Sequence, residues 1–158
     1  MKNRFLSNIL LTFIWVALTG NFIFANYFFG FLLSFFMLWL ITSGTGEAKY
    51  FRIFPKVITF LFFFLYELVK ANLQVAYEVM TPNYNMTPGI VKVPLDAKTN
   101  MEISFLANLI SLTPGTLSLD VSDDKKVLYV HSMYITSKES FIRGIKNGFE
   151  KRILEILR

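Results

Sequence analysis

Two ionisable side chains, Glu67 and Lys70, lie in an otherwise apolar stretch of the chain and are the first candidates for chemistry. Charged groups at membrane depth are costly and often mark the path of an ion or a proton. Residues three apart on a helix can also pair with each other. Because a proton path needs several such groups, we interpret Glu67 and Lys70 as an intrahelical pair or as a contact with another subunit.

His131 is the single histidine, and the chain contains no cysteine. The sequence therefore predicts no metal site, since zinc is usually held by several residues of these two types. Ser104, Ser111 and Asp120 would complete a hydrolytic triad, but the chain has no Gly-x-Ser-x-Gly turn to expose a nucleophile. We interpret His131 as a packed or hydrogen-bonded strand residue, and we expect no catalytic residue, no cofactor and no enzyme activity.

Two other polar groups have structural interpretations. Residues 113–116, Thr-Pro-Gly-Thr, have the residue types of a phosphate-binding turn. They lack the spacing of a P-loop and its Gly-Lys-Ser/Thr ending, and a helix stop followed by entry into a strand explains them better. The amides of Asn72 and Gln74 suit hydrogen bonds across helices, and we expect them at an interface between helices.

The elements that must position these residues begin with an apolar block. The chain is more apolar than an ordinary soluble protein, because 54% of its 158 residues are hydrophobic and its mean hydropathy is +0.48. The net charge of +5 is spread along the sequence, unlike the basic patch of a nucleic-acid-binding protein. Polar breaks at residues 19–21 and at Asn26 divide the first apolar block into helices near residues 5–18 and 22–41.

A third helix is predicted at residues 56–81, between Pro55 and Pro82. Its first half has the composition of a membrane helix, whereas its second half, from Glu67 onward, is amphipathic. We therefore expect residues 1–82 to form a membrane domain with helices near 5–18, 22–41 and 56–81.

The charges near these helices give conflicting information about how often the chain crosses a membrane. If the first two helices both cross, the positive-inside rule places Lys2, Arg4 and the basic connector after the second helix in the cytoplasm. A third full crossing would then place the C-terminal part, which carries many Lys and Arg residues, outside. The number of full crossings stays open, and a third helix that only dips into the membrane is one solution.

Residues 83–158 are predicted to form a small α/β domain. Thr99 and Glu102 form a capping box at the start of one helix, and Thr136 and Glu139 form a second. The intervening strands alternate apolar and polar residues. The order is β-α-β-β-α, with strands at residues 90–95, 116–122 and 127–135, the last two as a hairpin. We expect a three-stranded sheet with two helices on one side.

Several segments resemble those of one family in the same order along the chain. Residues 107–117, Ala-Asn-Leu-Ile-Ser-Leu-Thr-Pro-Gly-Thr-Leu, followed by Leu-Tyr-Val-His at 128–131, closely resemble the E subunit of the multisubunit sodium/proton antiporter, the Mrp or Mnh complex. Residues 70–76 and 88–95 are similar to further segments of that family. The matching motif residues, to which we assign structure rather than chemistry, are Asn108, Thr113, Pro114, Gly115, Thr116 and His131.

The resemblance implies an accessory or assembly subunit of a complex in the bacterial cell membrane that exchanges sodium for protons. In that family larger subunits carry the ion-translocating machinery, and the E subunit has its C-terminal domain on the cytoplasmic side. Its partners would be the other antiporter subunits and the lipid bilayer, and not nucleic acid. The alternative is a membrane-anchored binding module that recruits a soluble regulator.

Overall fold

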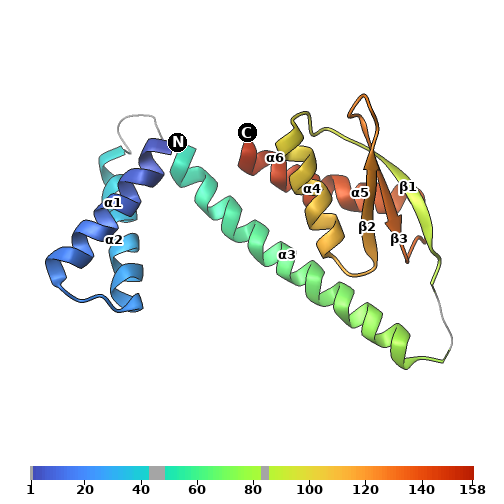
Figure 1. Ribbon diagram of the computed structural model, residues 1–158, viewed down its shortest axis with the longest axis horizontal. Coiled ribbons are helices and arrows are strands. Elements are labelled where there is room, and N and C mark those ends of the chain that lie inside the picture. The colour runs from blue at the N-terminus through green and yellow to red at the C-terminus, as the bar shows by residue number, and fades with distance from the viewer. Residues whose placement is uncertain (1, 43–48, 83–85) are drawn as a thin grey trace. The chain divides into compact units, whose positions relative to one another are not determined.

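The computed structural model describes residues 2–42, 49–82 and 86–158, which form two compact units (Figure 1). The first unit extends to Pro55, and the second begins at Lys56. The division therefore lies within a long helix, whereas the sequence suggests a change of domain after residue 82. The expected first residue of the second domain lies outside the described residues.

The first unit is built around a hairpin of two apolar helices, α1 (Lys2–Thr19) and α2 (Phe24–Thr42). Gly30 lets α2 approach α1 closely, because a Cβ at this position would lie 2.8 Å from Cδ1 of Trp15. Trp15 Nε1 donates a hydrogen bond to Oδ1 of Asn26 at 3.0 Å. Asn26, which the sequence suggests as a break, thus lies in the first turn of α2 and stabilises the hairpin.

The hairpin exposes most of its large apolar side chains. Leu18 is 81% exposed, and Phe24 is 85% exposed. By length and hydropathy, α2 is the one described helix suited to crossing a membrane, and α1 contributes a shorter apolar stretch at Arg4–Thr19. Surfaces of this kind need lipid or another apolar partner.

The prediction that the third helix begins after Pro55 is wrong. Helix α3 (Lys49–Met80) begins upstream and includes Pro55. Its first turns are stabilised by aromatic packing, since the rings of Tyr50, Phe51 and Phe54 lie with their centroids 5.6, 5.0 and 4.9 Å from that of Phe35 in α2. These contacts offset the backbone hydrogen bond that a proline cannot donate.

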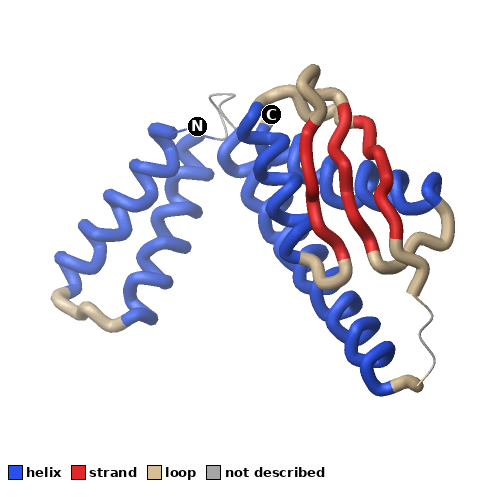
Figure 2. The backbone as a smooth tube through the Cα atoms, turned by 45° about the vertical axis from the view of Figure 1, so that its right-hand side comes forward, coloured by secondary structure: helices blue, strands red, loops and turns tan. Residues whose placement is uncertain are grey.

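The second unit contains a three-stranded antiparallel sheet in the order β1-β3-β2 (Figure 2). Strands β1 (Gly89–Pro94) and β2 (Thr116–Val121) both pair with the central strand β3 (Val127–Ser132). Strands β2 and β3 form the hairpin that the sequence predicts, with a register shift between Ser118 and Asp120.

One face of this sheet is covered by helix α4 (Asn100–Leu112) and by a C-terminal helical segment, and α3 packs on these helices (Figures 1 and 2). The side chains Phe60, Phe63 and Phe64 of α3 pack against the core that the sheet and the covering helices share. The apolar first half of α3 therefore has a protein partner inside its own chain. The fully buried members of that core are Val91, Val93, Leu106, Leu128 and Val130.

The C-terminal helical segment is not one regular helix. It consists of α5 (Lys138–Ile145), a π-helical turn (Lys146–Glu150) and α6 (Lys151–Leu157). Nη1 of Arg152 donates to the carbonyl oxygens of residues 147 and 148 at 2.9 and 3.0 Å, so the side chain satisfies acceptors within the turn. The guanidinium also lies 4.0 Å from the ring centroid of Phe63.

The two predicted capping boxes have different outcomes. The hydroxyl of Thr99 accepts from the backbone N–H of Glu102, and the Glu102 side chain accepts from the N–H of Thr99, as the sequence predicts. Helix α5 is instead capped by Ser137, whose hydroxyl accepts from the N–H of Ser140 at 3.2 Å. The second box is therefore wrong, because the cap lies one residue further along the chain.

Two buried carboxylates hold the loop between β1 and α4. Oε1 of Glu150, a residue that is 1% exposed, accepts from the backbone N–H groups of Asp96 and Ala97 at 2.6 and 2.9 Å. Its other oxygen lies 3.0 Å from Nζ of Lys146. Glu102 accepts from Arg158 Nε at 3.0 Å, and this hydrogen bond is the main reason that the pKa of Glu102 is lowered to about 2.

Two glycines test how tightly α3 packs on the C-terminal helical segment. A Cβ on Gly148 would lie 3.2 Å from Cζ of Phe63, whereas a Cβ on Gly144 would meet open space. Both substitutions by alanine gain helix propensity, so the difference between them reports the contact with Phe63. We expect Gly148→Ala to be less stable than Gly144→Ala by about 1 kcal/mol. Hydrogen exchange of the α3 amides in the full chain measures this difference, and equal protection in the two variants would contradict it.

The Glu102 carboxylate also predicts a pH dependence. Its folded pKa of about 2 lies below the ordinary value of 4.5, so its contribution is present above pH 4.5 and is lost as the pH falls towards 2. We expect at most about 3 kcal/mol from this group. Arg158→Gln should flatten the pH dependence, and Lys138→Gln, at an exposed position, should leave it unchanged. Methyl NMR spectra of the full chain between pH 5 and pH 2 provide the measurement.

Candidate functional site

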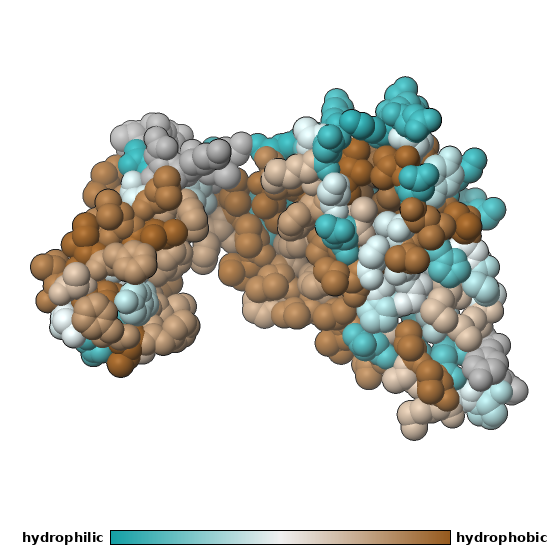
Figure 3. Space-filling model, in the orientation of Figure 1, coloured by the Kyte–Doolittle hydropathy of each residue, from teal (hydrophilic) through white to brown (hydrophobic). Residues whose placement is uncertain are grey.

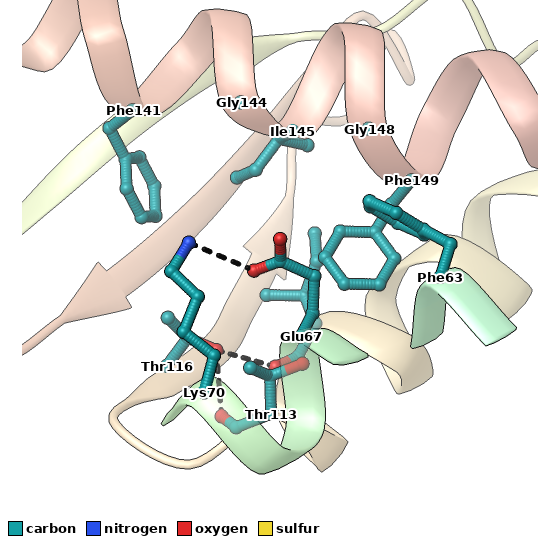
Figure 4. Close-up of a pocket in the computed structure, with 11 residues that line it drawn as sticks. Phe63, Glu67, Lys70, Thr113, Thr116, Phe141, Gly144, Ile145, Gly148 and Phe149 are labelled. Carbon is teal, nitrogen blue, oxygen red and sulfur yellow. Dashed lines mark hydrogen bonds and ion pairs between the residues drawn. The ribbon is translucent and has the colours of Figure 1, made fainter. Parts of the chain in front are cut away.

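A pocket of about 280 Å³ opens between α3, the end of α4 and the α5–π-turn segment (Figure 4). All of its lining residues belong to the second compact unit. Its walls are mainly apolar, and its polar groups come from α3 and from the segment 113–116. The lining consists of Phe63, Glu67, Lys70, Ile110, Thr113, Thr116, Phe141, Gly144, Ile145, Gly148 and Phe149.

Glu67 and Lys70 bring opposite charges to this pocket. Nζ of Lys70 lies 3.5 Å from Oε2 of Glu67, in the i, i+3 geometry that the sequence suggests. The Lys70 side chain is 58% exposed and that of Glu67 is 26% exposed. The pair therefore lies at the edge of the apolar cavity and remains in reach of solvent or of a partner.

Thr113 and Thr116 reach the pocket because they end helix α4. The Thr116 hydroxyl donates to the carbonyl oxygens of Ile110 and Thr113 at 2.6 and 2.9 Å. The Thr113 hydroxyl donates to the carbonyl oxygen of Leu109 at 3.1 Å. These bonds satisfy carbonyl groups that the end of a helix leaves without partners. The two threonines have the structural role expected of a helix stop.

Gly115 makes the turn between α4 and β2. Its φ of +83° is a conformation that side chains rarely adopt. A Cβ there would also lie 3.2 Å from Cε2 of Tyr134. Burial of the Tyr134 phenol, together with the negative charge of Glu78 on α3, raises its pKa. Residues 113–116 are thus close to Tyr134, the residue on which the charge of Glu78 in α3 acts.

The other predicted site residues lie outside the pocket lining. Asn72 and Gln74 are exposed on α3, and Asn72 Nδ2 donates to the Leu68 carbonyl of the same helix at 2.8 Å. Asn108 is exposed on α4. His131 lies on the central strand β3, in register with Ile90 and Leu117. Pro114 is half-buried beside the two threonines.

Sequence reasoning missed the glycines of the pocket. Gly144 and Gly148 are spaced four apart, a pattern of small residues that lets another helix approach. Phe141 and Phe149 belong to the hydrophobic core and also form walls of the pocket. The four-residue glycine spacing was the available signal, and of the two glycines Gly148 is the one that α3 contacts, through Phe63.

The side chains that line the pocket are of the kinds that bind another group. An apolar cavity with an ion pair at its edge can receive an apolar side chain and hydrogen-bond the backbone or polar group beside it. Among the described residues, no group of three potential metal ligands lies close together. The described lining contains carboxylate, ammonium and hydroxyl groups, and each hydroxyl donates to a backbone carbonyl of α4 or its end.

Comparison with known sequences identifies the family. The family model described as "Na+/H+ ion antiporter subunit" matches residues 8–156. The chain is 38% identical to the E subunit of the Na(+)/H(+) antiporter of Alkalihalophilus pseudofirmus over 156 residues, which is 99% of both chains. It is 35% identical to the E subunit of the Bacillus subtilis antiporter over 158 residues, which is the full length of both.

Two solved structures are similar to the chain. A chain of the membrane-bound sulfane sulfur reductase, an archaeal respiratory membrane complex, matches 97% of this chain with 28% identity and a TM-score of 0.54; the match covers 98% of that chain. A chain of the Mrp complex from Dietzia sp. DQ12-45-1b matches 65% of this chain and 96% of its own length, with 26% identity and a TM-score of 0.50. The family match confirms the resemblance carried by residues 107–117 and 128–131, and it gives a location in the cell membrane. The chain belongs to the E subunits of the Na+/H+ antiporter and is a component of a multisubunit membrane complex.

Proposed function

We propose that this chain is an accessory subunit, which helps to assemble and hold a sodium/proton antiporter complex without moving ions itself. The observation that carries the proposal is the isolated ion pair at the pocket. Glu67 and Lys70 are the ionisable side chains among the described residues that line it, and they pair with each other. A relay across a membrane requires several such groups in sequence.

The pocket is the proposed contact with a larger subunit. Its mainly apolar walls and open mouth suit one large apolar side chain, which would be anchored between Phe141 and Phe149. Lys70, the more exposed of the two charged residues, would hydrogen-bond a carbonyl group next to that anchor. Gln74, one turn further along α3 on the same side as Lys70, would contribute a polar contact at the rim of the same interface.

We further propose that α1 and α2 are the membrane part of the subunit. The elements from β1 to α6 (residues 86–158), which we name the α/β module, would lie on the cytoplasmic side. The apolar exposed surface of the hairpin supports the first statement. The basic residue Arg52, in the first turn of α3, supports the second through the positive-inside rule.

The proposal predicts how two substitutions act. Glu67→Ala and Lys70→Ala should reduce the amount of assembled complex severalfold, because truncating an anchoring residue of an interface typically costs about 1–2 kcal/mol. The complex that still assembles should keep its sodium affinity. Purification of a tagged copy in mild detergent, with quantitative mass spectrometry of the large subunits, measures assembly. Antiport in membrane vesicles at varied sodium concentrations measures affinity.

Lys138→Ala is the matched control, because it removes an exposed lysine at the start of α5 outside the pocket. It should leave both the yield of complex and the sodium affinity unchanged. A selective loss of sodium affinity in Glu67→Ala at unchanged complex content would contradict an accessory role and would indicate that the pair takes part in ion movement.

A further inference from the structure

Helix α3 has a continuous apolar surface on the side away from the α/β module, which we name the outer stripe. Its members follow each other at steps of three and four residues, which places them on one side of a helix. Phe62, Leu73 and Met80 are 68%, 66% and 86% exposed. Figure 3 shows hydrophobic residues gathered over the half of α3 nearer its N-terminus. The outer stripe consists of Ile58, Phe62, Leu65, Val69, Leu73, Ala76 and Met80.

The opposite side of α3 contacts the module at points between residues 56 and 78. At one end Lys56 Nζ lies 3.4 Å from the Glu155 carbonyl oxygen. In the middle the Phe63 ring centroid lies 5.3 Å from that of Phe149. Near the other end the Glu78 charge acts on the Tyr134 phenol. Residues 56–78 span about 33 Å at a rise of about 1.5 Å per residue.

This packing is incompatible with a crossing of the membrane by α3. A bilayer core is about 30 Å thick, so a crossing over residues 56–78 would bring the module into the hydrocarbon along with the helix. The module carries a charged turn at residues 123–126 and two open sheet edges, which lipid does not tolerate. The two ends of α3 must therefore lie on the same side of the membrane.

The start of α3 packs on the helical hairpin of the first unit. Its aromatic residues Tyr50, Phe51 and Phe54 pack on Phe35 of α2, the helix suited to crossing. The path from Thr42 to Lys49 is seven Cα steps and reaches at most about 25 Å. Helix α3 thus begins beside α2, within that distance of the end of the helix suited to crossing.

We propose that α3 lies in the plane of the membrane, with its outer stripe in the lipid interface and the module carried on its other side. Two exposed apolar residues beside the stripe, Leu61 on one side and Tyr77 on the other, widen the arc to about 160° at about 100° per residue. Asn72 also lies within this arc, and its amide donates to the Leu68 carbonyl of the same helix. A single partner helix needs only a narrow seam, so this width favours a fluid lipid surface. The exposed cation Arg52 stands at the end nearest α2, where it attracts anionic headgroups.

The in-plane placement of α3 does not depend on the accessory role, and single-cysteine variants test it. Because the chain contains no cysteine, each variant carries one thiol in this chain. Arg52→Cys and Pro82→Cys mark the two ends of α3, and Asp123→Cys marks the module as a matched control. The tagged protein is labelled within its complex, in right-side-out and inside-out membrane vesicles, by a maleimide that cannot cross lipid. We expect all three thiols to react in the same vesicle orientation, and reaction of the two ends in opposite orientations would overturn the proposal.

A depth measurement tests the lipid contact itself. Nitroxide labels at Ile58→Cys, Val69→Cys and Leu73→Cys are compared in the reconstituted complex for collisions with oxygen and with a water-soluble nickel chelate. An in-plane helix gives preferential collision with oxygen and one common depth at all three positions. A depth that is greatest at Val69 would indicate a crossing helix. Low collision with both reagents would show that another subunit covers the stripe, and either result would overturn the proposal.

Discussion

The second unit depends on one contact, the packing of the α3 phenylalanines against the helices that cover the sheet. A three-stranded sheet with two short helical segments buries little apolar surface by itself, so an additional layer contributes much of its stability. Phe63 is central to that layer, because its ring contacts Phe149, lies under the Arg152 guanidinium and would lie 3.2 Å from a Cβ at residue 148. The pocket, the ion pair at its edge and the orientation of the outer stripe all follow from how α3 is seated there.

Buried polar groups fix the positions of loops and helix ends, because hydrogen bonds are directional and apolar packing is not. The buried Glu150 carboxylate accepts hydrogen bonds from backbone N–H groups of the loop after β1, which have no strand or helix partner among the described residues. Lys146 balances its negative charge. A buried carboxylate with these partners is costly to disturb, because loss of any one leaves a charge or an N–H group unsatisfied. The position of α4, and with it the position of the threonines at its end, is therefore tied to the C-terminal helices.

The sequence was most informative where the signal was local. The capping box at Thr99, the β2–β3 hairpin and the i, i+3 pair of Glu67 and Lys70 follow from residue types a few positions apart. The partner of α3 could not be read in this way. Hydropathy reports that a side chain avoids water, and Phe60, Phe63 and Phe64 would have the same composition whether they faced lipid or protein. The start of α3 upstream of Pro55 depended on ring contacts with α2, a helix distant in sequence.

The π turn explains a regularity in the last part of the chain. Apolar residues recur at strict intervals of four, at positions 141, 145, 149, 153 and 157. In a regular α-helix each interval of four overshoots a full turn by about 40°, so these residues would drift by about 160° and the last would point away from the first. A turn that holds one additional residue absorbs about 100° of this drift. Phe141 and Leu157 can thus both lie against the same core. The strict four-residue spacing of the apolar residues is therefore the sequence pattern that the additional residue of the π turn requires.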